Sequence, residues 1–241
     1  MSEFENKIAI VTGGTGGLGQ VIVNLFANEG MKIYVPVRSI EDFRSKFDNS
    51  MNDASTDFKL RKIYAFQCNA ENEQDVIRFV DDVVKREKRI DYLVNTVGGY
   101  HPKKMIEEMD YELIDKMMNL NFKSTFLFCK NVLSGMAANN YGRITAIGAM
   151  PAIETTPGKF AYSISKSNVV NLIQTIAEEY KENNIMANVI IPSTIDTQAN
   201  RASMPDADYT KWVSAEDIAK TILYLCSDSA KSFYGNVVRM Y

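Results

Sequence analysis

A tyrosine and a lysine four residues apart are the strongest candidates for chemistry in this sequence. Tyr162 and Lys166 are spaced so that a helix places phenol and ammonium on one face. A phenol with a pKa of about 10 is a poor acid–base group at neutral pH, and moving it to about 7 takes roughly 4 kcal/mol of differential stabilisation. A neighbouring ammonium favours the phenolate and supplies part of that energy. The pair therefore indicates proton transfer, although an amphipathic helix with a packed tyrosine and a solvated lysine would show the same spacing.

A cluster of glycines follows the first apolar run of the chain. Residues 12–19 read TGGTGGLG, between a predicted strand at 8–11 and a segment with apolar residues at helical spacing. Glycines allow a tight turn and a close approach of the backbone to a pyrophosphate, which the helix N-terminus stabilises. A tight loop without a ligand is the alternative, but the strand–turn–helix context favours a dinucleotide. The expected contacts in this cluster are Gly13, Thr15, Gly17, Leu18 and Gly19.

The kind of dinucleotide is expected to depend on the end of the second predicted strand, residues 33–37. A site that prefers NAD usually carries an acidic residue about 20 residues beyond the glycines. Here Arg38 ends the strand, and an arginine can pair with the 2′-phosphate of NADP or stack on adenine. A solvated arginine before a helix capped by Ser39 is the alternative. We therefore expect NADP as the preferred cofactor, with NAD as the other possibility.

Seven short apolar runs alternate with segments of helical period along the chain. The runs are residues 8–11, 33–37, 64–67, 92–97, 143–147, 187–191 and 237–240. Asn72 and Ser214 precede two of the helical segments in capping positions. Strands buried on both faces and alternating with helices imply right-handed crossovers and a parallel sheet. We expect one α/β domain over residues 1–241, with a doubly wound parallel sheet of about seven strands flanked by helices. Residues 48–57 and 193–211 are expected to be irregular, the first as a surface connection.

Composition limits the function classes. A formal net charge of −3 gives no reason to expect a nucleic acid or an anionic membrane as partner. No apolar run reaches the roughly 18 residues of a membrane span, and residues 1–5 lack the pattern of a secretory signal. Cys68, Cys129 and Cys226 are far apart and form no CxxC, so we expect buried free thiols rather than a metal site or disulfides. A cytoplasmic protein that acts on a small molecule fits these features best.

Together, the motifs resemble the short-chain dehydrogenase/reductase family. The glycine cluster matches its TGxxxGxG pattern, and the YxxxK pair follows at the usual distance of that family. Residues 95–98 (NTVG) resemble its NNAG segment and residues 192–197 (PSTIDT) its PGxxxT segment, and Asn69 stands where the family usually has an Asp near the adenine. The resemblance implies a Rossmann fold and an NAD(P)H-dependent oxidoreductase. It adds to the expected cofactor contacts Asn69, Asn95, Gly98, Tyr162, Lys166, Pro192, Ile195 and Thr197.

A third catalytic residue is implied by the same resemblance. Asn121 aligns with the asparagine of the family that helps to hold a water next to the lysine, although Asn119 competes for the role. A polar residue that kinks a helix is the plainer interpretation of either. The helical segments 122–138 and 160–182 are apolar around their circumference and correspond to the dimer bundle of the family. The resemblance therefore implies a homodimer or a homotetramer.

The sequence departs from the family at the position of its catalytic serine. That serine normally ends the fifth strand, 13 residues before the tyrosine, and here the position holds Ala149. Alanine cannot donate a hydrogen bond to a substrate carbonyl. Either the substrate needs no such donor, or a hydroxyl such as that of Thr155 or Thr156 replaces it, or catalysis is weak. His101, the only histidine, is expected in an exposed loop bordering the site, with a role as general acid as the alternative.

A narrower resemblance, to dihydropteridine reductase-like members of the family, bears on this departure. It rests on residues 148–149, 156–158 and 195–212, and those members also carry an alanine in place of the serine. Their quinonoid pterin accepts hydride on a conjugated ring, so no carbonyl oxyanion requires a serine. Two differences are that they prefer NADH, with an acid after the second strand, and that they lack the asparagine read here at 121.

Three functions follow from these observations. The first is reduction of a conjugated pterin- or quinone-like substrate by hydride transfer, with Tyr162 as proton donor. The alternative is a general carbonyl reductase or alcohol dehydrogenase of the same family, and the second alternative is a non-catalytic dinucleotide-binding sensor. The expected substrate contacts are Ala149, Thr156, Met204 and Trp212.

Overall fold

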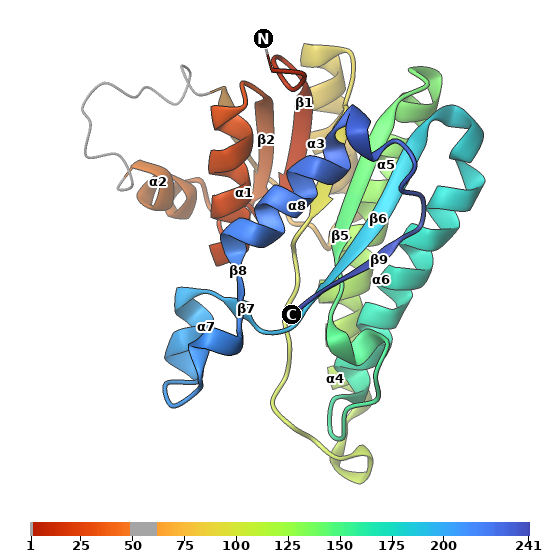
Figure 1. The fold of residues 1–241 in the computed structure, drawn as a ribbon. Helices are drawn as coiled ribbons and strands as arrows, with labels where there is room; N and C mark the ends of the chain where they lie inside the picture. The colour runs from red at the N-terminus through yellow and green to blue at the C-terminus, as the bar shows by residue number, and fades with distance from the viewer. Residues whose placement is uncertain (1, 49–61) are drawn as a thin grey trace.

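Seven parallel strands form the central sheet, in the order β3-β2-β1-β4-β5-β6-β9 (Figure 1). The computed structural model describes residues 2–48 and 62–241. The strands of this sheet are β1 Ile8–Thr12, β2 Lys32–Val37, β3 Ile63–Gln67, β4 Tyr92–Asn95, β5 Gly142–Ile147, β6 Ile185–Pro192 and β9 Val237–Met240. All seven predicted strands are therefore confirmed. The fourth is two residues shorter than expected, because the chain leaves the sheet where the Thr96 hydroxyl donates to the carbonyl of Thr12 (2.6 Å).

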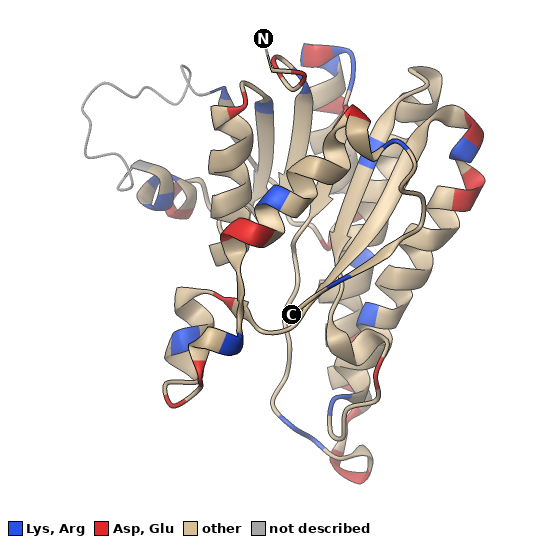
Figure 2. Ribbon diagram, viewed as in Figure 1, with Lys and Arg blue, Asp and Glu red and all other residues tan. Residues whose placement is uncertain are grey.

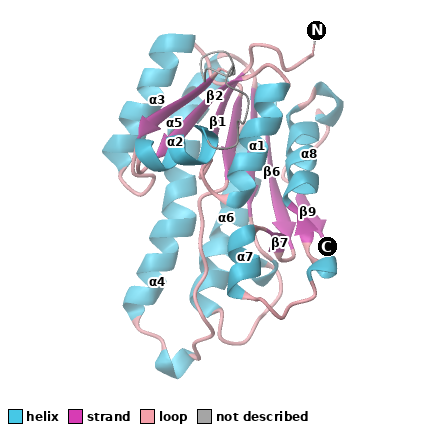
Figure 3. Ribbon diagram, turned by 90° about the vertical axis from the view of Figure 1, so that its left-hand side faces the viewer, coloured by secondary structure: helices cyan, strands magenta, loops and turns pink. Residues whose placement is uncertain are grey.

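Helices cover both faces of this sheet (Figure 3). They are α1 Gly17–Asn28, α2 Ile40–Asp48, α3 Glu73–Glu87, α4 Tyr111–Met117, α5 Ser124–Ala138, α6 Phe160–Glu179, α7 Gln198–Ser203 and α8 Ala215–Cys226. In β1, Ile8 and Ile10 pack with residues of α3, α5 and α6, whereas Ala9 and Val11 pack with residues of α1, α2 and α8. A strand buried on both faces needs a continuous apolar run, which is why these strands could be predicted from the sequence.

The predicted helix starts agree with the structure. Asn72 accepts a hydrogen bond from the amide of Asp75 (3.1 Å), and Ser214 accepts one from Asp217 (3.0 Å). Ser39 likewise accepts one from the amide of Asp42 (3.1 Å). Each cap satisfies an N–H that has no partner within the helix.

The expectation of irregular structure over residues 193–211 is wrong. This segment contains β7 Ile195–Asp196, which pairs in parallel with β8 Val213–Ser214, and the helix α7. Elements of two and six residues are too short to show a hydrophobic period. The helix expected to reach residue 182 ends at Glu179, before a 3-10 turn at Lys181–Asn183. Apart from Asp48, the connection expected over 48–57 lies outside the described residues.

The order of the strands reverses between β1 and β4. In open parallel sheets, ligands bind outside the carboxyl ends of the strands at such a reversal. That edge is the lower end of the molecule in Figure 1, where α7 also lies. Figure 2 shows basic and acidic residues interspersed along the helices, strands and loops. In the part of the chain that the structure describes, no helix has both the length and the apolar character needed to cross a membrane.

Candidate active site

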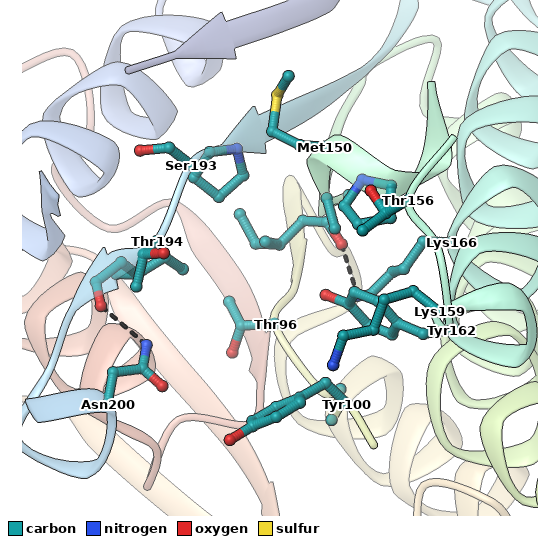
Figure 4. Close-up of a pocket in the computed structure, with 18 of the residues that line it drawn as sticks. Thr96, Tyr100, Met150, Thr156, Lys159, Tyr162, Lys166, Ser193, Thr194 and Asn200 are labelled. Carbon is teal, nitrogen blue, oxygen red and sulfur yellow. Dashed lines mark hydrogen bonds between the residues drawn. The ribbon is translucent and has the colours of Figure 1, made fainter. Parts of the chain in front are cut away.

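A cavity of about 570 Å³ opens beyond the carboxyl ends of β4, β5 and β6 (Figure 4). Several residues singled out in the sequence share its wall. They are Gly98, Ala149, Thr156, Tyr162, Lys166, Pro192, Ile195 and Met204. The position matches the one expected from the reversal of strand order, so we take this cavity as the candidate active site.

Tyr162 and Lys166 reach this cavity from the first turns of α6. Lys166 is only 5% exposed, and its ammonium donates to the carbonyl of Ile147 at the end of β5 (2.8 Å). Burial lowers the pKa of Lys166 to about 8 and raises the pKa of Tyr162 to about 12, because both charged forms lose hydration. Without further positive charge the phenol therefore holds its proton at neutral pH, the state that a proton donor requires.

Asn121 is itself fully buried, in a hydrogen-bond network beside this pair. Its side-chain oxygen accepts from the amide of Gly99 (2.9 Å), and its side-chain nitrogen donates to the carbonyl of Gly99 and to the Ser165 hydroxyl (3.0 Å each). Ser165 in turn donates to the carbonyl of Tyr162 (2.8 Å). Asn121 thereby connects the loop after β4 to the helix that carries the candidate proton donor.

The backbone around Asn121 explains how a polar residue comes to be buried there. Residues Met118–Lys123 form a π-helical segment, and the Asn121 carbonyl accepts from the Thr125 hydroxyl (2.9 Å). Such a widened turn interrupts a helix and is frequent at functional sites. Asn119, the competing residue, is exposed. Of the two asparagines, only Asn121 is brought next to Tyr162 and Lys166.

Gly98 marks how closely these groups pack. A Cβ at this position would lie 2.9 Å from the Asn121 side-chain oxygen and 3.0 Å from the Lys166 ammonium nitrogen. Any larger residue would push the network and the lysine apart. Asn95, three residues earlier, is buried, and its side-chain nitrogen contacts the sulfur of Cys129 (3.6 Å).

The glycine turn after β1 fits the pyrophosphate of a dinucleotide. Gly13 has a φ of +67°, and a Cβ there would lie 2.7 Å from the Thr96 side-chain oxygen. No side chain caps the start of α1, so its first N–H groups are free to bind an anion. The amides of Gly17 and Leu18 would hold the phosphates. A Cβ at Gly17 would lie 2.9 Å from the Cβ of Thr197, which places that segment against the turn.

At the end of β2, Arg38 is engaged with a neighbouring carboxylate. Its guanidinium pairs with Glu71 at 2.7 Å, and its side chain is 70% exposed. Asn69 lies close by and caps the amide of Glu71 through its side-chain oxygen (3.1 Å). Arg38 thus follows the last residue of β2, as predicted, but its guanidinium already faces a negative charge.

The remaining sequence candidates are divided between two places. Ala149 is buried in the cavity wall with no hydroxyl to offer, and the exposed Thr156 lines the same cavity. Thr155 lines a neighbouring groove instead. Trp212 does not line the cavity in the described structure; its ring lies 4.7 Å from that of Tyr209. Thr156 is therefore the candidate hydroxyl on the same wall as Ala149.

The expectation that His101 is exposed is wrong. The side chain is 4% exposed, and its Nδ1 lies 2.6 Å from the carbonyl of Pro102. The carbonyl of His101 accepts from the ammonium of Lys159 (2.7 Å), which folds the loop against the start of α6. A single histidine next to glycines and a proline shows no periodic pattern that would predict burial. Its burial therefore depends on the tertiary contact with Lys159, which the sequence does not reveal.

Sequence reasoning missed three residues near the candidate site. Lys159 lines the cavity, Ser165 belongs to the asparagine network, and Glu71 holds Arg38. A signal existed for Ser165, because it lies three residues after Tyr162 on the same helix and such positions share one face. Lys159 lies just before the helix begins and had no such signal. Glu71 had no local signal, since its contact with Arg38 spans 33 residues of chain.

Comparison with known proteins agrees with the fold and the motifs. The model of the short chain dehydrogenase family matches residues 7–208. A 7alpha-hydroxysteroid dehydrogenase of Clostridium sardiniense is 30% identical over 245 residues, which cover 95% of this chain and 90% of that protein. A 3-oxoacyl-acyl-carrier-protein reductase of Thermotoga maritima is 26% identical, covering 98% and 96%.

The fold is shared with solved structures as well. A short-chain type dehydrogenase/reductase from Mycobacterium ulcerans has a TM-score of 0.89 at 24% identity, covering 98% of this chain and 88% of that one. The family model spans most of the chain, and the sheet, the glycine turn and the tyrosine–lysine pair stand in one arrangement. The chain therefore belongs to the short chain dehydrogenase family and is an NAD(P)-dependent oxidoreductase.

Proposed function

We propose that this protein interconverts a ketone and the corresponding secondary alcohol. The observation that carries the proposal is the placement of Tyr162 and Lys166 in the wall of one cavity beyond the sheet, beside a glycine turn that fits a pyrophosphate. The relatives support it, because the names of two of them denote the oxidation of a hydroxysteroid and the reduction of a 3-oxoacyl group.

The residues of the chain would divide the reaction as follows. The nicotinamide ring, when bound, supplies the hydride that forms the new C–H bond. Tyr162 donates its proton to the substrate oxygen, which receives the electron pair of the carbonyl bond. The resulting phenolate is stabilised by the Lys166 ammonium and then takes a proton from solvent. Asn121 acts through others, by holding the Gly99 loop and Ser165 in place.

The oxygen of a ketone gains negative charge during the reaction and benefits from a second donor. Ala149 offers none, and Thr156 has a hydroxyl on the same cavity wall. We propose Thr156 as that donor. Thr156→Val should lower kcat/KM for ketones about tenfold, the size expected for one lost hydrogen bond. Adding Ala149→Ser should restore it, and an unchanged Thr156→Val enzyme would refute the assignment.

A second candidate function rests on Ala149 itself. A conjugated pterin- or quinone-like ring accepts hydride without forming a carbonyl oxyanion at the serine position, so an alanine there is no handicap. The deciding experiment follows NADPH or NADH oxidation with a panel of ring ketones, a quinone and quinonoid dihydropterin. We expect turnover of ketones. Turnover of the pterin or quinone alone would favour the second candidate, and dinucleotide binding without any turnover would favour a sensor.

We propose NADP as the preferred cofactor. The support is the position of Arg38 at the end of β2, where an acidic residue would be expected for NAD. Glu71 opposes this preference by pairing with the guanidinium. Arg38→Met should weaken binding of 2′,5′-ADP and leave binding of 5′-ADP unchanged. Equal losses for both nucleotides would overturn the proposal.

We further propose a homodimer or homotetramer in the cytoplasm. Large aromatic side chains are exposed on neighbouring helices of one face, at Tyr111, Phe126 and Phe160, and support the assembly. Light scattering during gel filtration would test the assembly, and a monomer at all concentrations would refute it. The cytoplasmic location is supported by three buried free cysteines, which fit a reducing compartment.

A further inference from the structure

A second ammonium group faces the candidate active site. Lys159 stands at the N-cap position of α6, just before its first helical residue and three residues before Tyr162. Its nitrogen lies 5.2 Å from the centre of the Tyr100 ring, and both residues line the cavity. In Figure 4 the side chain extends into the space between Tyr100 and Tyr162.

This ammonium has donors to spare. One of its three N–H groups is directed to the carbonyl of His101 (2.7 Å). Within the described chain, no carboxylate lies within ion-pair distance of Lys159, and none of the cavity-lining residues is an Asp or a Glu. The nearby Lys104, by contrast, is paired with Asp110. Lys159 is therefore a cation in the cavity that lacks an acidic partner.

The other lysine of the cavity cannot take the same part. Lys166 is buried, donates to Ile147 and stands beside the candidate proton donor. Lys159 is only half-buried and keeps contact with solvent. The rest of that wall is largely apolar, with Met150, Pro151, Ile195 and Met204. The cavity thus pairs one accessible cation with surfaces suited to a hydrocarbon body.

We propose that Lys159 binds a carboxylate of the substrate, so that the preferred substrate is an apolar ketone or secondary alcohol that also carries an acid. This inference rests on the proposed function and specifies its substrate class. The acid would lie beside the reacting oxygen, because the Lys159 side chain extends into the space between Tyr100 and Tyr162 and all three residues line the same cavity (Figure 4). A hydrogen-bonded charge pair of this kind favours the acid over a neutral analogue about tenfold.

The test separates binding from turnover. Calorimetry measures the affinity of the protein, saturated with NADPH, for cyclohexanecarboxylate and for cyclohexanecarboxamide, which has nearly the same shape without the charge. We expect the acid to bind about tenfold more tightly. Lys159→Met should abolish that difference, and Lys159→Arg should retain most of it. Lys103→Met is the matched control, because it removes the same charge from an exposed loop position outside the cavity.

The same comparison with oxocyclohexanecarboxylate and its amide measures kcat/KM. The preference for the acid should shrink as salt is added, since the pair is partly exposed. Equal binding of acid and amide by the unaltered protein, or a preference that survives Lys159→Met, would overturn the inference even if ketones are reduced. If no ketone is reduced but the acid still binds through Lys159, the proposed function fails and the carboxylate site stands.

Discussion

Two regions at the carboxyl edge of the sheet, the candidate catalytic end and the end of β2, are built in opposite ways. At the candidate catalytic end, Asn121, Ser165 and Lys166 are buried and held by hydrogen bonds at 2.8–3.0 Å. At the end of β2, Arg38 and Glu71 form an ion pair whose arginine is 70% exposed. A buried polar network must be complete to be tolerated, whereas an exposed pair contributes little and is easily changed.

This difference indicates which properties of the enzyme are open to variation. Altering a member of the buried network leaves other polar groups without partners, so geometry and stability are lost together. Altering the surface pair changes only the charge exposed at the end of β2. We expect the chemistry of the site to be intolerant of substitution and its choice of dinucleotide to be adjustable.

The largest effect is expected from removing the proposed proton donor. Tyr162→Phe should lower turnover about 10²–10⁴-fold, the usual contribution of a positioned acid or base. Dinucleotide affinity should hardly change, because the ring and the neighbouring lysine remain. Steady-state rates with a ketone and fluorescence titration with NADPH measure the two quantities. Tyr100→Phe, at the other tyrosine of the cavity, is the control and should lose less than tenfold. Similar losses in both variants would contradict the assignment.

The asparagines at 119 and 121 test the buried network. Asn121→Ala removes hydrogen bonds to both backbone groups of Gly99 and to Ser165, and should lower the free energy of unfolding by about 2–4 kcal/mol. Asn119→Ala changes an exposed side chain and should stay within about 0.5 kcal/mol. Urea unfolding measures both. Equal effects would mean that the network contributes nothing specific to stability.

The buried charge of Lys166 should lower the free energy of unfolding at neutral pH. Burial lowers the pKa of Lys166 to about 8, against about 10.4 in an unfolded chain. Below pH 8 both states carry the charge, and the folded state bears the full cost of its lost hydration. As pH rises above about 8, the folded lysine loses its proton, whereas the unfolded lysine keeps its proton up to about 10.4. The folded state then no longer holds a buried charge, and this cost disappears.

Lys166→Met should therefore stabilise the protein by about 1–3 kcal/mol at pH 7, and the gain should fade by pH 10, while turnover is lost. The lost hydrogen bond to Ile147 offsets part of the gain. Unfolding curves at the two pH values measure the effect. Lys220→Met, at an exposed position on α8, should show no such dependence on pH. A gain that grows between pH 7 and pH 10 would reverse the argument.

The same contrast between buried and exposed explains what could be predicted from the sequence. The seven strands are continuous apolar runs and the helix caps are short local patterns, so the sequence predicts both. The glycine turn and the tyrosine–lysine pair are local patterns as well. The burial of Asn121 and His101 could not be predicted, because a polar residue looks the same in the sequence whether it lies in the protein interior or on the surface. Glu71 reaches Arg38 only through the fold, and β7, α7 and β8 are too short to show a period.

The smallest effect is expected at the surface pair. Glu71→Gln frees the guanidinium of Arg38 and should raise the affinity for 2′,5′-ADP about two- to fivefold, as expected for an exposed pair, with 5′-ADP unchanged. Calorimetry at low salt measures both nucleotides, and the gain should shrink in high salt because exposed charges are screened. Glu73→Gln removes an equal charge from the start of α3, where Glu73 pairs with Lys130, and is the matched control. An equal gain in the control would assign the effect to net charge, and an equal gain for 5′-ADP would show that Glu71 does not act on the 2′ position.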